Sequence, residues 1–399
     1  MRRYLFVMSE TGGGHRSAAE AVRQAMLERH PRDVRIDVVD IFAELERWPY
    51  DRFAEWYRHL TRLQSLPWGA LYHLTDGPRT YAAIESTIWP TVRKPLLRFL
   101  RRHPADVIVT FHPIPNRSLG RALRELGEGT PLVGVAVDLV QVHAAFWTPD
   151  LYRAYVPLEV SHRNAIAQGA VGSRIEVLGG MPVRPAFRGA RALDQAEVRE
   201  QLGLDPHRPV VLVTAGGDGM GLVKRTTEEL LRQCPEAQLV AVAGRNHELY
   251  RELGQIAPRS RLHVKGFVHD MARWMRAADV MVTKAGPNTV CEALVLGLPL
   301  VMHTQLRGQE AGTAEWVCAH GAGLWEPRSR AAALAVRRLL AAPATRQAMS
   351  LAAQRLIDPH VAERLGQALW ALAANRQPDQ GGKLELPGLI PQLAELPLA

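Results

Sequence analysis

The chain has 399 residues, of which 47% are hydrophobic and 22% charged, and its formal net charge is +9. A chain of this length exceeds what one hydrophobic core commonly serves, so two domains are expected, and the composition excludes a disordered protein. No apolar run approaches the roughly 18 residues that a membrane-spanning helix needs. The positive charge is compatible with nucleic acid, anionic lipid or an anionic substrate.

Short apolar runs alternate with helical stretches along the chain. Those of the first half predict strands at 4–9, 35–41, 106–112, 132–138, 153–158 and 175–178. Those of the second half predict strands at 209–215, 238–243, 261–266, 279–283 and 299–303. Runs rich in Val, Ile and Leu are typical of parallel strands buried on both faces by helices. The predicted fold class is therefore α/β, with two Rossmann-like domains.

Local signals indicate the structure of the two chain ends and the position of the domain boundary. Arg2 and Arg3 precede an apolar run, as in a signal peptide, but Glu10 ends that run early, which favours a buried first strand. Two prolines and a glycine pair stop regular structure near 180–187, so the predicted domains are 1–180 and 181–375. The remaining residues, 376–399, are predicted to form a loosely ordered tail.

Three cysteines bear on the compartment. Cys234, Cys291 and Cys318 are odd in number and lack the spacing of metal ligands. This pattern excludes a disulfide framework and a zinc site, and it favours a reducing cytoplasm.

One segment, 42–103, is far longer than an ordinary crossover between strands. It holds four of the nine tryptophans and is interpreted as an insertion that carries specificity for an acceptor. Its residues 88–102 have apolar side chains at helical spacing with Arg and Lys between them. This pattern predicts an amphipathic element that docks on an anionic membrane, and a helix packed on the sheet is the alternative. Pro90 and Pro95 are expected to interrupt any long helix here.

The first glycine-rich loop runs from Thr11 to His15, directly after a strand, and opens a helix. Three glycines allow close approach to a ligand, and a helix N-terminus offers free N–H groups to anions. His15 would face a cleft between the domains, where a neutral imidazole can take a proton from a hydroxyl. A phosphate loop with an incidental histidine is the alternative. The Gly-x-Gly-x-x-Gly fingerprint is absent, which argues against a dehydrogenase.

The second loop, 215–221, opens the second domain in the same way and contains four glycines. Close approach of its backbone to a phosphate is expected, and a structural tight turn is the alternative.

The third stretch, 283–292, ends a strand, turns at Gly286-Pro287 and opens a helix with Asn288 and Thr289. Its N-terminus is predicted to hold a diphosphate without metal, through the helix dipole and amide donors. Glu292, one turn in, can accept both hydroxyls of a ribose. N-capping by Asn288 or Thr289 is the competing account.

The fourth stretch, 307–310, follows the last predicted strand. Its adjacent Gln309 and Glu310 can hydrogen-bond to sugar hydroxyls. A generic helix start is the alternative, but the position after consecutive strands of a doubly wound sheet favours a binding role.

These stretches together resemble glycosyltransferase family 28, and specifically the monogalactosyldiacylglycerol synthases and processive diacylglycerol glucosyltransferases. The resemblance spans most of the chain in the same order. The matching stretches are 9–17 (S-E-T-G-G-G-H-R-S), 180–187, 216–221, 243–246, 264–268, 283–292 and 308–310.

The resemblance implies a GT-B fold and inverting transfer of a hexose from UDP-glucose or UDP-galactose to a lipid, giving a β-glycosyl lipid. It implies His15 as the general base, the backbone around Phe267 and Val268 as the uracil site, and Glu292 as the ribose site. The residues implied for the phosphates and the sugar are Gly14, Gly217, Gly219, Met220, Gly221, Gly286, Pro287, Asn288, Thr289, Gln309 and Glu310. No manganese-type Asp-x-Asp pair is present, so no cofactor or metal is expected.

Departures from the family pattern concern mainly the acceptor side. Asn288 stands where the family often has glycine, and Val137 where a threonine usually precedes Asp138. His112, Asp138 and His143 are the expected acceptor-side residues. The expected partners are a diacylglycerol-type lipid and an anionic membrane surface, with the protein bound peripherally on the cytoplasmic face.

Other functions fit the sequence less well. A UDP-sugar epimerase has a similar two-domain build but no use for the insertion. A non-catalytic UDP-sugar sensor would not need both His15 and Glu292. A nucleic-acid binder would account for the charge, but the basic residues form no compact block and no recognition motif is present.

Overall fold

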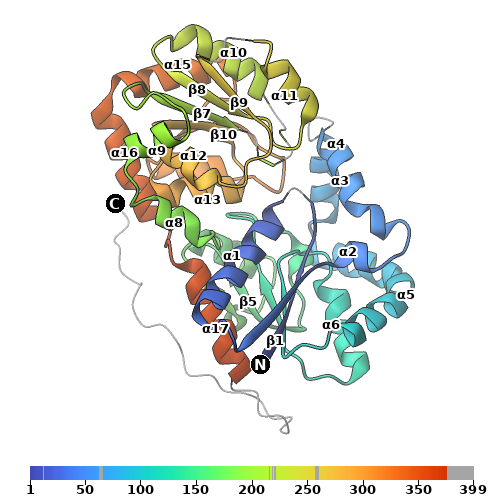
Figure 1. The fold of residues 1–399 in the computed structure, drawn as a ribbon. Coiled ribbons are helices and arrows are strands. Elements are labelled where there is room, and N and C mark those ends of the chain that lie inside the picture. The colour runs from blue at the N-terminus through green and yellow to red at the C-terminus, as the bar shows by residue number, and fades with distance from the viewer. Residues whose placement is uncertain are drawn as a thin grey trace.

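The computed structural model describes residues 1–11, 13–62, 66–214, 216–217, 219, 222–256 and 260–374, which form two α/β domains, one above the other (Figure 1). The tail predicted at 376–399 lies outside the described residues. Each domain is built on a six-stranded sheet in which every strand pair is parallel. The predicted α/β class is therefore confirmed.

All eleven predicted strands are present, and a twelfth, too short to stand out in the sequence, completes the second sheet. The first sheet contains β1 (Arg2–Met8), β2 (Val34–Asp40), β3 (Val107–Thr110), β4 (Leu132–Val135), β5 (Leu151–Val156) and β6 (Ile175–Val177). The second contains β7 (Val210–Thr214), β8 (Gln238–Val242), β9 (Leu262–Lys265), β10 (Val280–Lys284), β11 (Leu300–Thr304) and β12 (Gly323–Trp325). Central strands such as β3 and β7 are buried throughout, since helices cover both faces.

Helices occupy most of the remaining chain. Those of the first domain are α1 (Gly14–Arg29), α2 (Ile41–Glu44), α3 (Phe53–Arg62), α4 (Leu66–Thr75), α5 (Pro78–Arg102), α6 (Asn116–Leu126) and α7 (Glu159–Ala167). After the connection come α8 (Pro185–Ala190), α9 (Gln195–Gln201), α10 (Val223–Gln233), α11 (His247–Leu253), α12 (Met271–Ala277), α13 (Pro287–Leu296), α14 (Thr313–Ala319), α15 (Ser329–Ala341), α16 (Pro343–Leu356) and α17 (Val361–Ala374). Short 3-10 turns are η1 (Tyr50–Arg52), η2 (Ala144–Phe146) and η3 (Gly172–Arg174).

The order of the strands determines where a ligand can bind. The first sheet runs β2-β1-β3-β4-β5-β6 and the second β12-β11-β10-β7-β8-β9. Each order reverses direction once, between β1 and β3 in the first sheet and between β7 and β10 in the second. Loops leave opposite faces at such a switch point, which opens a crevice at the carboxyl ends of the strands. The glycine-rich loops after β1 and β7 and the Gly286-Pro287 turn after β10 all begin at these points.

The insertion folds as helices α2 to α5 with η1 between them. The expectation that Pro90 and Pro95 interrupt a long helix is wrong, because α5 runs unbroken through both over 25 residues. Each proline lacks an N–H and leaves one intrahelical bond unmade. Dense packing of the helix offsets that loss: Val92, Leu96 and Phe99 are buried against the first sheet and α6.

The same packing determines the role of the apolar residues in 88–102. The apolar stripe of α5 lies inside the core, so the interpretation of that stripe as a membrane-inserting face is wrong, and the alternative of a helix packed on the sheet holds. Its basic residues Lys94, Arg98 and Arg101 remain exposed. Among the side chains of the insertion that the structure describes, the large apolar ones that are exposed lie elsewhere: Trp48, Trp56, Leu71 and Leu74.

The last described helix, α17, returns to the first domain although the sequence places it in the second. It contacts α1 and β3 along its length (Figure 1). The guanidinium of Arg2 lies 3.5 Å from the centre of the Trp370 ring and donates to the Trp370 carbonyl, and the His30 ring stacks on the same indole. The two domains are thus joined both at 178–184 and through α17.

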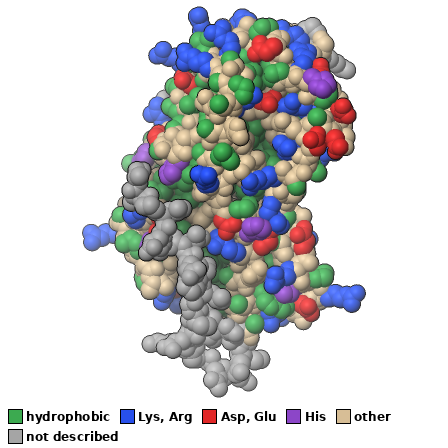
Figure 2. Space-filling model, turned by 90° about the vertical axis from the view of Figure 1, so that its left-hand side faces the viewer, with side chains coloured by type: hydrophobic (Ala, Val, Ile, Leu, Met, Phe, Trp, Pro, Cys, Tyr) green, Lys and Arg blue, Asp and Glu red, His purple; other side chains and the backbone are tan. Residues whose placement is uncertain are grey.

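Charge is spread over the surface in view in Figure 2. On that face, Lys and Arg side chains of the described residues occur on both domains with Asp and Glu among them. This distribution does not form the continuous basic groove that nucleic-acid binding favours there. In the part of the chain that the structure describes, no helix is both long and apolar enough to cross a membrane.

Candidate active site

A cavity of about 340 Å³ lies between the domains, at the carboxyl ends of both sheets. The loops after β1 and β4 and Tyr57 of α3 contribute from the first domain, and the loops after β7, β8, β9, β10 and β11 contribute from the second. Of the residues predicted to form the site, those lining this cavity are Gly14, His15, Asp138, Gly217, Phe267, Val268, Gly286, Pro287, Asn288, Thr289, Glu292, Gln309 and Glu310. Gly219 lies behind it, and Met220 and Gly221 lie outside the described residues.

Two helix N-termini meet across this cavity. A Cβ at position 14 would lie 2.7 Å from Asn288 Nδ2, so the first turn of α1 lies directly against the Asn288 side chain of α13. At the start of α13 no side chain caps the helix, which leaves its first N–H groups free and speaks against a capping role for Asn288 or Thr289. Each terminus carries partial positive charge, so their convergence favours an anion between them.

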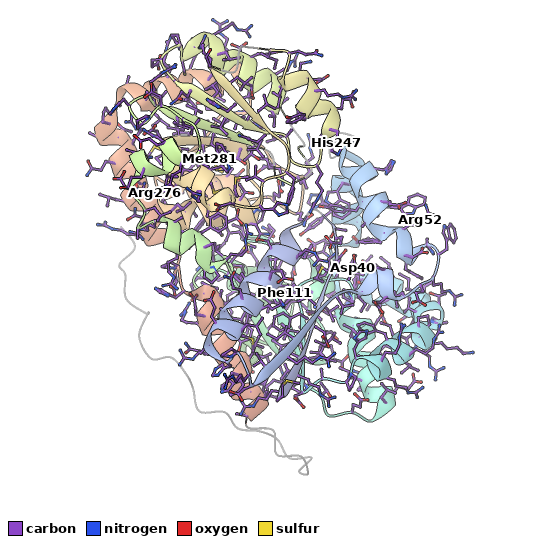
Figure 3. All side chains as sticks on the ribbon, viewed as in Figure 1. Asp40, Arg52, Phe111, His247, Arg276 and Met281 are labelled. Carbon is purple, nitrogen blue, oxygen red and sulfur yellow. The ribbon has the colours of Figure 1, made fainter. Side chains whose placement is uncertain are left out.

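His15 is held with one defined nitrogen available. Its Nδ1 lies 2.5 Å from the carbonyl oxygen of Phe111, which can only accept a hydrogen bond, so Nδ1 carries the proton and Nε2 is the free base. Burial lowers the pKa of His15 to about 4, and the Phe111 hydrogen bond only partly offsets this effect. Figure 3 shows Phe111 at the centre of the molecule, beside α1. The imidazole is therefore neutral at pH 7.

The three expected acceptor-side residues lie at different depths. Asp138 lines the cavity, and burial raises its pKa to about 7. His112 packs behind His15, with ring centres 4.5 Å apart, and its Nδ1 accepts from the Ile114 N–H. His143 accepts from the Ala145 N–H and contacts Thr75 through Nε2. His112 and His143 therefore contact other protein groups and do not line the cavity. His143 contacts the last residue of α4, Thr75.

Glu292 lies on α13, opposite the first turn of α1. It is buried, contacts Ser17 through a side-chain hydrogen bond and lies near Arg184. Burial raises its pKa to about 7, although Arg184 and Ser17 act in the other direction. Arg184 also lines the cavity. The sequence pattern did not single it out, because it stands in the irregular connection between the domains.

The loop after β7 is held by backbone contacts that only glycine permits. Gly219 has φ +58°, and a Cβ there would lie 2.1 Å from the Ala243 carbonyl oxygen. A Cβ at Gly244 would lie 2.3 Å from the Gly217 carbonyl oxygen. A structural tight turn, the alternative for this loop, therefore accounts for Gly219, whereas Gly217 faces the cavity. Beside it, the Arg245 guanidinium lies 4.5 Å from the centre of the Phe267 ring, and that ring is 44% exposed.

Gln309 and Glu310 are each tied to a residue that sequence reasoning missed. The Tyr57 hydroxyl, from α3 of the insertion, donates to Gln309 Oε1 over 3.0 Å, and the Gln309 side chain also hydrogen-bonds to Asp138. Glu310 forms an ion pair with Lys284 at the end of β10 and accepts from the Leu306 N–H. The position of Lys284, just before the Gly286-Pro287 turn, was the only signal available for it.

Groups of three or more potential metal ligands do not occur within the described ranges. The charged side chains that line the cavity are Arg16, Glu20, Asp138, Arg184, Arg245, Lys284, Glu292 and Glu310. Two of these cations are in ion pairs, Arg16 with Glu10 and Lys284 with Glu310, and Arg184 lies near Glu292.

Comparisons with known proteins agree with this geometry. Residues 15–183 match the family described as monogalactosyldiacylglycerol (MGDG) synthase, and 210–312 match the glycosyltransferase family 28 C-terminal domain. The chain is 33% identical over 332 residues to monogalactosyldiacylglycerol synthase of Spinacia oleracea, covering 81% of this chain and 63% of that one. It is 32% identical to monogalactosyldiacylglycerol synthase 3 of Arabidopsis thaliana, covering 80% of this chain and 70% of that one. The chain thus spans less than two thirds of the Spinacia relative.

Among solved structures, Acinetobacter baumannii MurG superposes with a TM-score of 0.59 at 14% identity, covering 93% of this chain and 100% of MurG. A co-structure of S. aureus MnaA with UDP gives 0.62 at 13% identity, covering 96% and 100%. Two facing parallel sheets around one cavity define the GT-B class of glycosyltransferase fold. Within that class, the chain belongs to the monogalactosyldiacylglycerol synthase family.

Proposed function

We propose that this protein transfers a hexose from UDP-galactose or UDP-glucose to a diacylglycerol-type lipid, with inversion at the anomeric carbon. The observation that carries the proposal is the arrangement of His15 opposite the α13 N-terminus within one cavity. A neutral base with a defined free nitrogen and an anion-binding helix terminus are the two groups that such a transfer needs.

In the proposed reaction, His15 Nε2 takes the proton of the acceptor hydroxyl while the hydroxyl oxygen attacks the anomeric carbon. The bond between that carbon and the phosphate oxygen breaks, and UDP leaves with the bonding electron pair. One displacement inverts the anomeric configuration, so an α-linked donor yields a β-glycosyl lipid. The Phe111 carbonyl stabilises the imidazolium that forms, because it holds the Nδ1 proton throughout.

Negative charge grows on the diphosphate as UDP leaves. The free N–H groups at the start of α13, which has 10 residues, together with the N-terminus of α1, are placed to stabilise that charge. Glu292 is assigned to the ribose hydroxyls and the segment at Phe267 and Val268 to the uracil. No metal is required in this proposal.

The lipid acceptor is supported by the insertion. This element contributes Tyr57 to the cavity lining, and it exposes Trp48 and Leu74, which are 71% and 73% accessible. The insertion therefore supplies both a residue of the cavity lining and exposed apolar surface, which suits a lipid with a buried hydroxyl and an outlying apolar body. Aromatic side chains of this kind partition to the interface of a bilayer. We assign peripheral attachment to an anionic membrane to this surface.

The test is to incubate the purified protein separately with UDP-galactose and UDP-glucose, and with diacylglycerol in anionic vesicles. The expected product is a β-glycosyl diacylglycerol and UDP, formed equally well in EDTA. Loss of activity in EDTA with recovery in manganese would contradict the metal-free assignment.

Two other outcomes would replace the proposal. Isomerisation of the UDP-sugar without lipid would identify an epimerase. Binding of UDP-sugar with no turnover under any acceptor would identify a sensor.

A further inference from the structure

Lys284 occupies an electrostatically unusual position. Its ammonium would lie 2.8 Å from a Cβ at Gly286, the residue that precedes the first turn of α13, so it sits against the positive end of that helix. Cations are unfavourable at a helix N-terminus and favourable at the other end. The Lys284 side chain is also only 17% exposed. Stability of the fold does not explain a cation here.

The anion that balances Lys284 is Glu310, whose side chain is 3% exposed. A buried ion pair contributes little net stability, because both charges lose their hydration. Glu310 is also fixed from a second direction, since its Oε2 accepts from the Leu306 N–H over 2.8 Å. Glu310 is therefore anchored in its own loop, whereas Lys284 has a flexible four-carbon stem.

Lys284 lies between the two loops that are predicted to bind the diphosphate. The Cε of Lys284 lies 3.5 Å from the Cβ position of Gly216, in the loop after β7, and its Nζ lies against Gly286, in the loop after β10. Lys284 thus bridges the two loops that border the switch point of the second sheet, and it faces the cavity.

We infer that Lys284 binds the diphosphate of the nucleotide-sugar and neutralises it as a leaving group. Before the nucleotide-sugar binds, Glu310 is the counterion of Lys284, and the phosphate then replaces Glu310 beside the ammonium. The inference rests on the proposed function and deepens it. Lys284 is then a cation at the leaving group, where other sites use a metal ion. Glu310, released from Lys284, becomes available to the hexose hydroxyls.

The test compares the binding of UDP and of uridine, which lacks phosphate, to the wild type and to Lys284→Met. Calorimetry suits UDP and ligand-observed NMR suits uridine. We expect UDP binding to weaken by about tenfold to a hundredfold, as for loss of a charge-assisted contact, and uridine binding to be unchanged. Lys284→Arg should restore part of the UDP affinity.

Lys224→Met is the matched control. Lys224 pairs with Glu252 on the surface of the same domain, with both side chains more than 40% exposed, and lies outside the cavity lining. It should leave binding of both ligands unchanged. Thermal unfolding of each variant checks that the domain remains folded.

Glu310→Gln tests the counterion half of the inference. UDP should bind this variant at least as tightly as the wild type, because no carboxylate competes for Lys284, while hexose transfer falls. Equal weakening of UDP and uridine by Lys284→Met, or unchanged UDP binding, would overturn the role of Lys284. Weakening of UDP by Glu310→Gln would overturn that of Glu310. If the wild type bound no UDP, the proposed function itself would fail.

Discussion

Burial moves the protonation of three cavity residues toward the neutral form. It lowers the pKa of His15 to about 4 and raises those of Glu292 and Asp138 to about 7. The physical cause is common to all three, since a charge loses hydration energy when it leaves water. The consequences differ by residue: His15 is kept as a base, whereas the two carboxyl groups titrate near neutral pH.

For His15, the substitution His15→Ala should lower kcat by about two to four orders of magnitude, because the acceptor hydroxyl loses its base. UDP affinity should change little. Single-turnover kinetics and UDP titration separate the two effects. Turnover close to that of the wild type would remove His15 from the catalytic role.

For Glu292, affinity for the UDP-sugar should fall as pH is lowered from 8 to 6, a range in which the diphosphate diester itself does not titrate. Above pH 7 the carboxylate is ionised and accepts strongly from ribose hydroxyls, and one pH unit below 7 only about a tenth of it is ionised. The fall should therefore approach about tenfold. Glu292→Gln, which cannot ionise, should bind the UDP-sugar more weakly than the wild type at pH 8 and equally at both pH values. A pH dependence retained in this variant would assign the titration to another group, such as Asp138.

At the scale of elements, the insertion joins the acceptor side to the sugar-binding loop. Gly308, with φ +84°, packs directly on the Tyr72 ring of α4, and Gly69 of the same helix meets Arg307. Tyr57 of α3 reaches the adjacent Gln309. Helices α3 and α4 are therefore in direct contact with three consecutive residues of this loop, Arg307, Gly308 and Gln309.

Tyr57→Phe should reveal this contact. The variant keeps the ring and loses one hydrogen bond of about 0.5–1.5 kcal/mol, so kcat/KM for the UDP-sugar should fall about twofold to tenfold. Binding of UDP without sugar should be unaffected. If UDP and UDP-sugar were affected alike, Tyr57 would support the cleft in general rather than Gln309.

Membrane docking should depend on two separate surfaces of the insertion. Changing Trp48 and Leu74 together to alanine should weaken co-sedimentation with vesicles at any salt concentration, because both side chains are exposed and apolar. Changing Arg98, Arg101 and Arg102 together to glutamate should weaken it at low salt only, since each basic residue contributes about 1 kcal/mol near an anionic surface. Equal binding of all variants to neutral and anionic vesicles would exclude the insertion as the docking element.

At the scale of the whole molecule, α17 ties the end of the second domain to the first. Leu369 of α17 is fully buried, and the Tyr4 hydroxyl of β1 approaches its carbonyl. Leu369→Ala should lower the free energy of unfolding by about 2–5 kcal/mol through lost apolar contact and a cavity. Urea unfolding followed by tryptophan fluorescence measures this loss. An unchanged midpoint would show that α17 is dispensable for the first domain.

Much of the architecture follows from the sequence by itself. Runs of Val, Ile and Leu between helical stretches determine buried parallel strands, because only a two-faced sheet hides such runs from water. Glycine-rich loops directly after β1 and β7, and the Gly286-Pro287 turn after β10, determine where a helix N-terminus and an anion can meet. These are local properties, and they sufficed to predict eleven strands and the loops after β1, β7 and β10 that border the cavity.

The remaining features depend on contacts between distant residues, which no local pattern records. The apolar stripe of α5 fits a membrane or a core equally well, and only its position over α6 and the sheet decides for the core. The pairs Lys284–Glu310 and Tyr57–Gln309 join positions 26 and 252 residues apart. The return of α17 to α1 is equally invisible in sequence. Charge pairing and burial arise from proximity in space, so the tertiary structure alone decided them.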